Sequence, residues 1–288
     1  MSRVVCAGHV NWDVTLHVDA LPVPDGEALI TEQRQAGGGS ASNTASVLGE
    51  LGYDPLLLGS LGDDQYADFV ERELQDAGVN CAYLKRVSDR DTTVKYLVVD
   101  EDGEVFVLAN KGANESYNAD DLPPEALANA AHLHLTSQHP VTARELLSRA
   151  QKREIPVSFD PGRRLGSRGF EELIATVDLL FLNEREAKAA RESGLLTARE
   201  KTTVIKRGDG GATLRSHDRE LSHDGFDAIP TDTAGAGDAF AAGFLAARCE
   251  GKDDAEALAI ANACGALAVQ AVGARVSMSW QEIDSLLS

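Results

Sequence analysis

The chain has 288 residues, 43% of them hydrophobic, so it is long enough for one large folded domain and is not typical of a disordered protein. It contains 46 Asp and Glu against 27 Lys and Arg, and the net charge of −19 argues against nucleic acid as a partner, because phosphate backbones bind basic surfaces. Only 8 of the 27 cationic residues are Lys. This composition favours a protein from a salt-accumulating halophile, and an ordinary acidic cytosolic protein is the alternative.

Nothing in the sequence indicates a membrane or secreted protein. No apolar run approaches the roughly 20 residues of a membrane span, and the opening "MSRVVCAGHVNWD" lacks the apolar core of a signal peptide. We therefore expect a cytoplasmic protein with no membrane contact. The cysteines are scattered without a C-x-x-C pair and are expected to be reduced thiols rather than a disulfide framework or zinc site: Cys6, Cys81, Cys249 and Cys264.

Short β-branched runs alternate with amphipathic stretches along the chain. Strands are expected at 3–8, 54–62, 131–137, 156–160, 177–183 and 202–208, and helices at 42–52, 67–79 and 142–155. This order predicts an α/β fold with a central, mostly parallel sheet and helices on both faces. Ligands of such sheets bind at the carboxyl ends of the strands, where Asp160, Asn183 and Gly208 lie.

Two regions lack the intervening helix. Residues 15–35 are expected to form a strand, a Pro-rich turn and a second strand, and 92–112 two strands joined by "EDGE". Together they would make a small second sheet that acts as a lid, built from about 14–35 and 92–112 of a single domain spanning 1–288. Decoration of the edge of the main sheet is the alternative.

A glycine-rich turn opens a helix at "TDTAGAGDAFAAG" (231–243). The bare N–H groups of such a turn and the helix dipole suit a phosphoryl group, and Asp238 would lie in the first turn beside it. Considered alone, Asp238 could equally be a helix cap and the glycines a turn.

A second glycine-rich turn opens a helix at "AGGGSASNTASVLGELG" (36–52). Close backbone approach at Gly38 and Gly39, with the amide of Asn43, would suit the hydroxyls of a sugar; a loop that uses glycine for positive φ is the alternative. Neither segment matches a P-loop, a dinucleotide turn or a protein-kinase catalytic loop.

The order and separation of these two segments resemble the ribokinase family of carbohydrate kinases, of the phosphofructokinase-B type. "GGGSASNTA" (37–45) is similar to the first family signature and "DTAGAGDAFAAGF" (232–244) to the second. Four further segments agree in order: "GHVNWD" (8–13), "LGSLGDDQYADFVERELQDAGV" (58–79), "NEREA" (183–187) and "ANACGALAVQAVGARVS" (261–277). The resemblance covers essentially the whole chain and implies a ribokinase-like three-layer sandwich with a small β lid.

The resemblance also implies catalytic roles. Asp238 would be the general base, and Glu186 would help to hold Mg²⁺ through water, with Asn183 near the phosphates. The anion hole would consist of the backbone N–H groups of Gly235, Ala236 and Gly237. Positioning and charge stabilisation are what phosphoryl transfer requires. On the residues alone, Asn183 and Glu186 could simply cap a helix.

The remaining site residues follow from the same resemblance. Asn11 and Asp13, whose spacing of two places both side chains on one strand face, would bind the sugar. The full substrate set is Asn11, Asp13, Gly38, Gly39, Asn43 and Arg164, and Lys206, Gly208 and Asn262 would join Asn183 at the nucleotide. Asp232 and Ser277 match positions near a monovalent cation, which in a salt-accumulating cytoplasm would be K⁺.

Two departures from the family pattern bear on the substrate. Ser40 stands where ribokinases proper carry Lys, which puts ribose in doubt, and Gly162 replaces Asn in "FDPGRR" (159–164). Arg164 matches the Arg that meets the substrate carboxylate in 2-keto-3-deoxygluconate kinases, or it is a surface cation that balances nearby acids.

Three histidines lie close enough in sequence to be candidates for a metal cluster: His132, His134 and His139. No acidic or thiol ligand has suitable spacing, so pocket or satisfied core histidines are expected instead of zinc ligands.

The sequence thus predicts an ATP-dependent kinase, with Mg²⁺ and K⁺ as ions, that phosphorylates a hydroxyl of a monosaccharide or sugar acid. A nucleoside kinase of the same fold and a non-catalytic sugar or nucleotide sensor are the alternatives. The small-molecule partners would be the sugar and ATP, and a homodimer would form through the lid.

Overall fold

The computed structural model describes residues 1–23, 25–102, 104–196, 201–217, 219–271 and 273–288. Pro24 and Gly103 of the expected lid turns and Val272 of the segment 261–277 lie outside these ranges. Within them, no helix is both long enough and apolar enough to cross a membrane.

The main sheet has nine strands in the order β13-β12-β11-β10-β9-β8-β1-β4-β5. Their bounds are β1 Arg3–Ala7, β4 Asp54–Gly62, β5 Asn80–Val87, β8 Ala130–Thr136, β9 Val157–Asp160, β10 Leu179–Asn183, β11 Thr202–Lys206, β12 Ala212–Ser216 and β13 Arg219–His223. All neighbouring pairs from β11 to β5 are parallel, and β12 and β13 add to the β11 edge antiparallel. The expectation of a mostly parallel sheet is confirmed.

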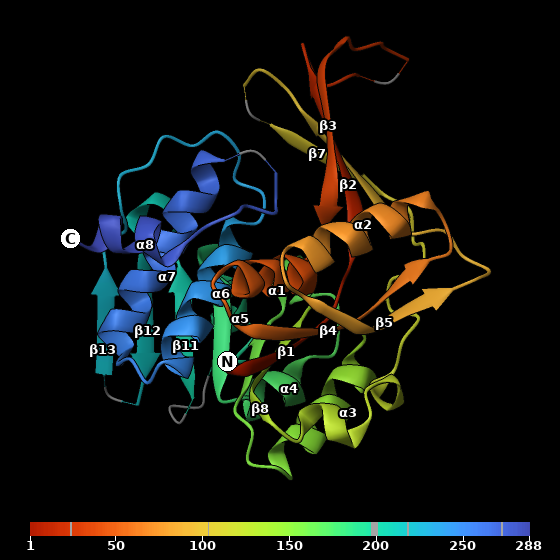
Figure 1. Cartoon of the computed structure of the whole chain (residues 1–288). Coiled ribbons are helices and arrows are strands. Elements are labelled where there is room, and N and C mark those ends of the chain that lie inside the picture. The colour runs from red at the N-terminus through yellow and green to blue at the C-terminus, as the bar shows by residue number, and fades with distance from the viewer. Residues whose placement is uncertain (24, 103, 197–200, 218, 272) are drawn as a thin grey trace.

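Helices cover both faces of this sheet (Figure 1). Their bounds are α1 Ser40–Glu50, α2 Gln65–Asp76, α3 Pro140–Gln151, α4 Glu171–Thr176, α5 Glu184–Glu192, α6 Ala236–Cys249, α7 Asp254–Gln270 and α8 Trp280–Leu287. Alternate residues of β1 enter two separate cores: Val4 and Cys6 pack with α1, α6 and α7, and Val5 and Ala7 pack on the side of α3 and α4. The three-layer α/β sandwich expected from the sequence is therefore present.

The second sheet contains four strands in the order β3-β2-β6-β7: β2 Asn11–Val18, β3 Ile30–Gly38, β6 Val94–Val99 and β7 Val105–Ala109. It projects away from the main body (Figure 1). The two hairpins expected at 15–35 and 92–112 are antiparallel, and they join through the parallel pair β2 and β6. Because these strands form a sheet of their own, the alternative that they decorate an edge of the main sheet is wrong.

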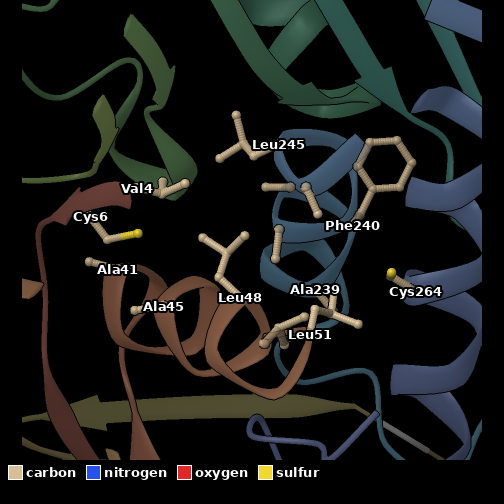
Figure 2. Close-up of a cluster of buried hydrophobic side chains, with 14 of the residues drawn as sticks. Val4, Cys6, Ala41, Ala45, Leu48, Leu51, Ala239, Phe240, Leu245 and Cys264 are labelled. Atoms are coloured by element: carbon tan, nitrogen blue, oxygen red, sulfur yellow. The ribbon is translucent and has the colours of Figure 1, made fainter. Parts of the chain in front are cut away.

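Small residues let α1, α6 and α7 approach closely beneath the glycine-rich turns. Ala41 of α1 lies toward Cys6 of β1, and Leu48 lies between α1 and α6 (Figure 2). A Cβ at Gly243 would lie 2.5 Å from Cys264 Sγ, so only glycine permits this spacing of α6 and α7. The packing fixes the N-termini of α1 and α6, where both sequence signatures lie.

Of the three histidines considered as metal ligands, His139 caps α3 by accepting from Val141 N, and the other two share a partner on β9. His132 Nε2 and His134 Nδ1 each lie 2.8 Å from Ser158 Oγ, and burial lowers the pKa of His132 to about 3 and that of His134 to about 4. They are satisfied core histidines, as the sequence indicated. The four cysteines are free, with Cys6 and Cys264 buried.

Candidate functional site

The turn before α6 holds its shape through a left-handed glycine. Gly235 has φ 74°, and a Cβ there would lie 2.3 Å from the carbonyl oxygen of Ala274. In the part of the chain that the structure describes, the N–H groups of Gly235 and Gly237 donate no hydrogen bond. The turn therefore presents free donors at the N-terminus of a fourteen-residue helix, an arrangement that favours an anion.

Asp238 lies in the first turn of α6 and contacts the other glycine-rich segment. Asn43 Nδ2 of α1 donates to Asp238 Oδ2 at 2.8 Å, although 195 residues separate the two. Burial raises the pKa of Asp238 to about 6; the bond from Asn43 opposes this rise, and the charge of Asp160 adds to it. A carboxyl group with a pKa this close to neutrality suits proton abstraction.

Charged side chains gather beside this turn at the carboxyl ends of β9 and β11. Lys206 Nζ lies 2.7 Å from Asp160 Oδ2 and 3.1 Å from the position a Cβ would take at Gly237. Burial alone would lower the pKa of Lys206, but Asp160 raises it, so the ammonium stays charged next to the turn. The sequence marked Asp160 as a strand end without assigning it a role.

Asn183 and Glu186 form a capping box at the start of α5. Asn183 N donates to Glu186 Oε2 at 2.9 Å, and Glu186 N donates to Asn183 Oδ1 at 2.8 Å. This is the structural role considered for them as an alternative. Burial and then the nearby charge of Asp160 raise the pKa of Glu186, while the bond from Asn183 N and the charges of Lys206 and Arg163 oppose the rise.

The residues expected to bind the sugar lie where β2 meets β3, and this part of the site is called the acceptor side. Asn11 Nδ2 donates to Asp13 Oδ1, as expected for two side chains on one strand face. A Cβ at Gly38 would lie 2.1 Å from Asp13 Oδ2, so glycine makes this close approach possible. Among the described residues, Oδ1 of Asn11 and Oδ1 of Asn43 are buried with no partner. Buried acceptors without a donor are what a polyhydroxylated ligand would satisfy.

A cavity of about 450 Å³ lies on the other side of the Gly235 turn. The expected nucleotide residues Lys206, Gly208 and Asn262 all line it, together with Phe226, Pro230, Gly237, Phe240 and Val269. Asn262 Nδ2 donates to Leu258 O of its own helix, which leaves the amide oxygen for other partners. The cavity and the acceptor side meet at Gly237 and Asp238.

Three expected site residues, Arg164, Asp232 and Ser277, have partners outside the group of residues described above. Arg164 is exposed and lies 3.4 Å from Glu115, whereas Arg168, which the sequence analysis missed, takes the closer position at 2.6 Å. The carboxylate of Asp232 accepts from the N–H groups of Ala234 and Gly273, and Ser277 Oγ donates to Glu50. In the described structure, Asp232 and Ser277 thus share no partner.

Two further cations were also missed. Arg275 Nη1 lies 2.8 Å from Glu73 Oε2, and the same Oε2 accepts from Gly37 N. Lys95 of β6 is the strand neighbour of Asp13. Strand alternation could have revealed Lys95 once the pairing of β2 with β6 was known, but no sequence signal indicates the place of Arg275.

The chain is similar to several known kinases over nearly its whole length. An ATP-dependent ribose-1-phosphate kinase of Halopiger xanaduensis is 46% identical over 292 residues, covering 100% of this chain and 99% of that protein. The structure of Arabidopsis thaliana ribokinase complexed with ribose and ATP matches with a TM-score of 0.87 at 26% identity, covering 99% of this chain and 98% of that one. The nucleoside kinase of Methanocaldococcus jannaschii matches with a TM-score of 0.84 at 26% identity, covering 100% and 98%.

The sequence profile described as pfkB family carbohydrate kinase matches residues 1–281. The resemblance inferred from the two glycine-rich signatures is therefore confirmed, as is the ribokinase-like fold. The chain belongs to the pfkB family of carbohydrate kinases.

Proposed function

We propose that the protein transfers the γ-phosphoryl group of ATP to a hydroxyl of a ribose-type sugar, and that ribose 1-phosphate is the preferred acceptor. The observation that carries the proposal is the contact between Asn43 and Asp238, which places a carboxyl of raised pKa between the acceptor side and the Gly235 turn. The substrate class rests on the full-length relative from Halopiger xanaduensis at 46% identity. The sequence departure at Ser40, where ribokinases carry Lys, also points away from plain ribose.

In this proposal Asp238 accepts the proton of the attacking hydroxyl. The N–H groups of Gly235, Ala236 and Gly237 hold the developing charge on the transferring phosphoryl group, and Lys206 adds a positive charge at Gly237. The buried amide oxygens of Asn11 and Asn43, with the carboxylate of Asp13, orient the sugar. Positioning of this kind supplies much of the rate in phosphoryl transfer.

The donor set fits Mg²⁺ bound mainly through water and phosphate. One oxygen of Glu186 caps α5, and the other accepts no hydrogen bond from a described residue, so it is available to a water ligand. Mg²⁺ typically keeps several waters and takes one or two carboxylates. When bound it would neutralise phosphate charge. Ser277 is engaged by Glu50, and no step here depends on K⁺ at Asp232 and Ser277.

A panel assay of ADP release tests the proposal. Ribose 1-phosphate, ribose, a sugar acid, adenosine and inosine are compared in molar KCl and at low salt, which also tests the halophilic assignment. We expect the highest kcat/KM with ribose 1-phosphate and loss of activity at low salt. A preference for a nucleoside would favour the alternative kinase, and binding of ligands without turnover would favour the sensor.

We further propose a homodimer formed through the lid. The outer strand β7 is an unpaired edge of its sheet, and Val105, Phe106, Val107 and Leu108 are all exposed. An exposed apolar edge strand on so acidic a chain is suited to pairing with another copy. Light scattering after size exclusion should give a dimer for the wild type and a monomer for Phe106→Glu; a wild-type monomer would refute the assignment.

A further inference from the structure

Lys95 is placed on the lid sheet directly beside the acceptor residues. Strand β6 runs parallel to β2, and the Cα of Lys95 is paired with that of Asp13. Side chains of paired residues point to the same face of a sheet, so Lys95 lies on the face that carries Asn11 and Asp13, while its exposed neighbour Tyr96 points to the other.

Lys95 has no ionic partner among the described residues. In this acidic chain many other cations lie within 4.0 Å of a carboxylate, including Arg86, Lys206 and Arg275. Asp13 is within reach of Lys95 but receives its hydrogen bond from Asn11. The half-buried ammonium therefore forms no direct ion pair, and its three N–H groups donate to no described residue, so they are available to a ligand.

The charge of Lys95 acts on both sides of the acceptor site. Burial raises the pKa of Asp13 and of Asp238, and Lys95 opposes the rise at both carboxyl groups. The ammonium therefore lies within electrostatic range of the residue that would orient the sugar and of the residue that would take its proton. A neutral sugar needs no such cation, because amides and carboxylates satisfy hydroxyl groups.

We infer that Lys95 binds a phosphate group carried by the acceptor sugar, so that the lid selects sugar phosphates over neutral sugars. Two carboxylates in the site, Asp13 and Asp238, would repel an anionic acceptor, and Lys95 offsets that repulsion. Lysine is well suited to this role because its compact ammonium donates three hydrogen bonds to phosphate oxygens. The inference deepens the proposed function and depends on its assignment of the acceptor site.

Binding measurements test it independently of turnover. Calorimetry compares ribose 1-phosphate with ribose, without ATP, for the wild type, Lys95→Met and Lys95→Arg. We expect Lys95→Met to lose about 10- to 100-fold in affinity for ribose 1-phosphate, the range of a charge-assisted hydrogen bond, with no change for ribose. Lys95→Arg should recover most of the loss. The exposed Lys188→Met on α5 is the matched control and should behave as the wild type.

Three outcomes would overturn the inference: equal loss for both ligands, no loss for either, or a wild type that binds ribose 1-phosphate no better than ribose. A rise in the KM of ATP with no change in acceptor affinity would assign Lys95 to the nucleotide phosphates instead. Tight, Lys95-dependent binding of ribose 1-phosphate without its phosphorylation would refute the proposed function and leave the phosphate subsite standing.

Discussion

Asp238→Asn should reduce activity and increase stability in the same protein. Asn has nearly the same shape and can still contact Asn43, but it cannot accept the proton, so turnover should fall about 10²- to 10⁴-fold. The stability gain arises because burial disfavours the charged carboxylate, as its pKa of about 6 against an ordinary 3.8 indicates. A difference of about two units corresponds to roughly 3 kcal/mol at neutral pH, and the partial exposure of Asp238 reduces this to about 1 to 3 kcal/mol.

The sign of the effect sets its pH dependence. A raised pKa in the folded state means that the charged form costs stability, fully so above about pH 6, and that this cost fades as pH falls toward the ordinary value of 3.8. The advantage of the Asn variant should therefore be largest near about pH 7.5 and fall to about half near pH 5. For a chain of this length, we expect a gain in Tm of a few degrees at the higher pH.

Thermal unfolding across this pH range at constant KCl, with ADP release measured on the same samples, checks both effects. Asp284→Asn on the exposed face of α8 is the control and should change neither Tm nor activity. An Asn variant no more stable than the wild type at the higher pH, or equally stabilised at every pH, would refute the account of Asp238 as a destabilised carboxylate. Near-normal turnover would remove it as the base.

Three further substitutions probe the surroundings of Asp238. Gly235→Ala should cost about 1 to 3 kcal/mol and most of kcat, because it strains a left-handed residue and forces the turn away from the loop behind it; Gly166→Ala, with open space at its Cβ, is the control in thermal unfolding and ADP release. Lys206→Met should destabilise by about 3 to 5 kcal/mol in denaturant unfolding, since it leaves Asp160 without its cation, and adding Asp160→Asn should recover much of the loss. Asn43→Ala removes the hydrogen bond that holds down the pKa of Asp238, so the acid limb of the pH profile of kcat/KM should move up by about one pH unit. An acid limb at the wild-type pH would contradict this.

The glycine-rich turns could be predicted from sequence because their chemistry is local. Gly235 needs a left-handed conformation and begins a helix, and both requirements follow from neighbouring residues. The order of strands and helices also followed from local periodicity, and the boundaries of the expected main-sheet strands and their helices lie within four residues of the observed ones. The strands β12 and β13 were missed, since each is only five residues long and β13 is largely exposed.

Contacts between distant segments could not be predicted in the same way. The pairing of Lys95 with Asp13 depends on β2 and β6 lying side by side, and these two residues are 82 positions apart in the sequence, with strands of the main sheet between them. The family pattern indicates Arg164, whereas the structure gives Arg168 the shorter contact with Glu115. Sequence spacing indicates which residue types are available but not which loop folds over them.

Arg275 connects three elements that surround the proposed site. Its guanidinium contacts Glu73 of α2 at 2.8 Å and Ser42 of α1 at 3.3 Å. Glu73 in turn accepts from Gly37 N at the base of the lid sheet, where a Cβ would lie 2.1 Å from the guanidinium.

Ala274, the residue before Arg275, packs against the Gly235 turn. The carbonyl oxygen of Ala274 occupies the space that a Cβ would need at Gly235, so one short segment packs against both glycine-rich turns. A rearrangement of the lid base at Gly37 must therefore displace Arg275 or break its bond to Glu73, and a displaced Arg275 shifts Ala274 against the anion-binding turn. Since the interior is packed too closely to absorb such shifts, the same few contacts would set the geometry of the proposed sugar site and of the turn proposed to bind the phosphoryl group.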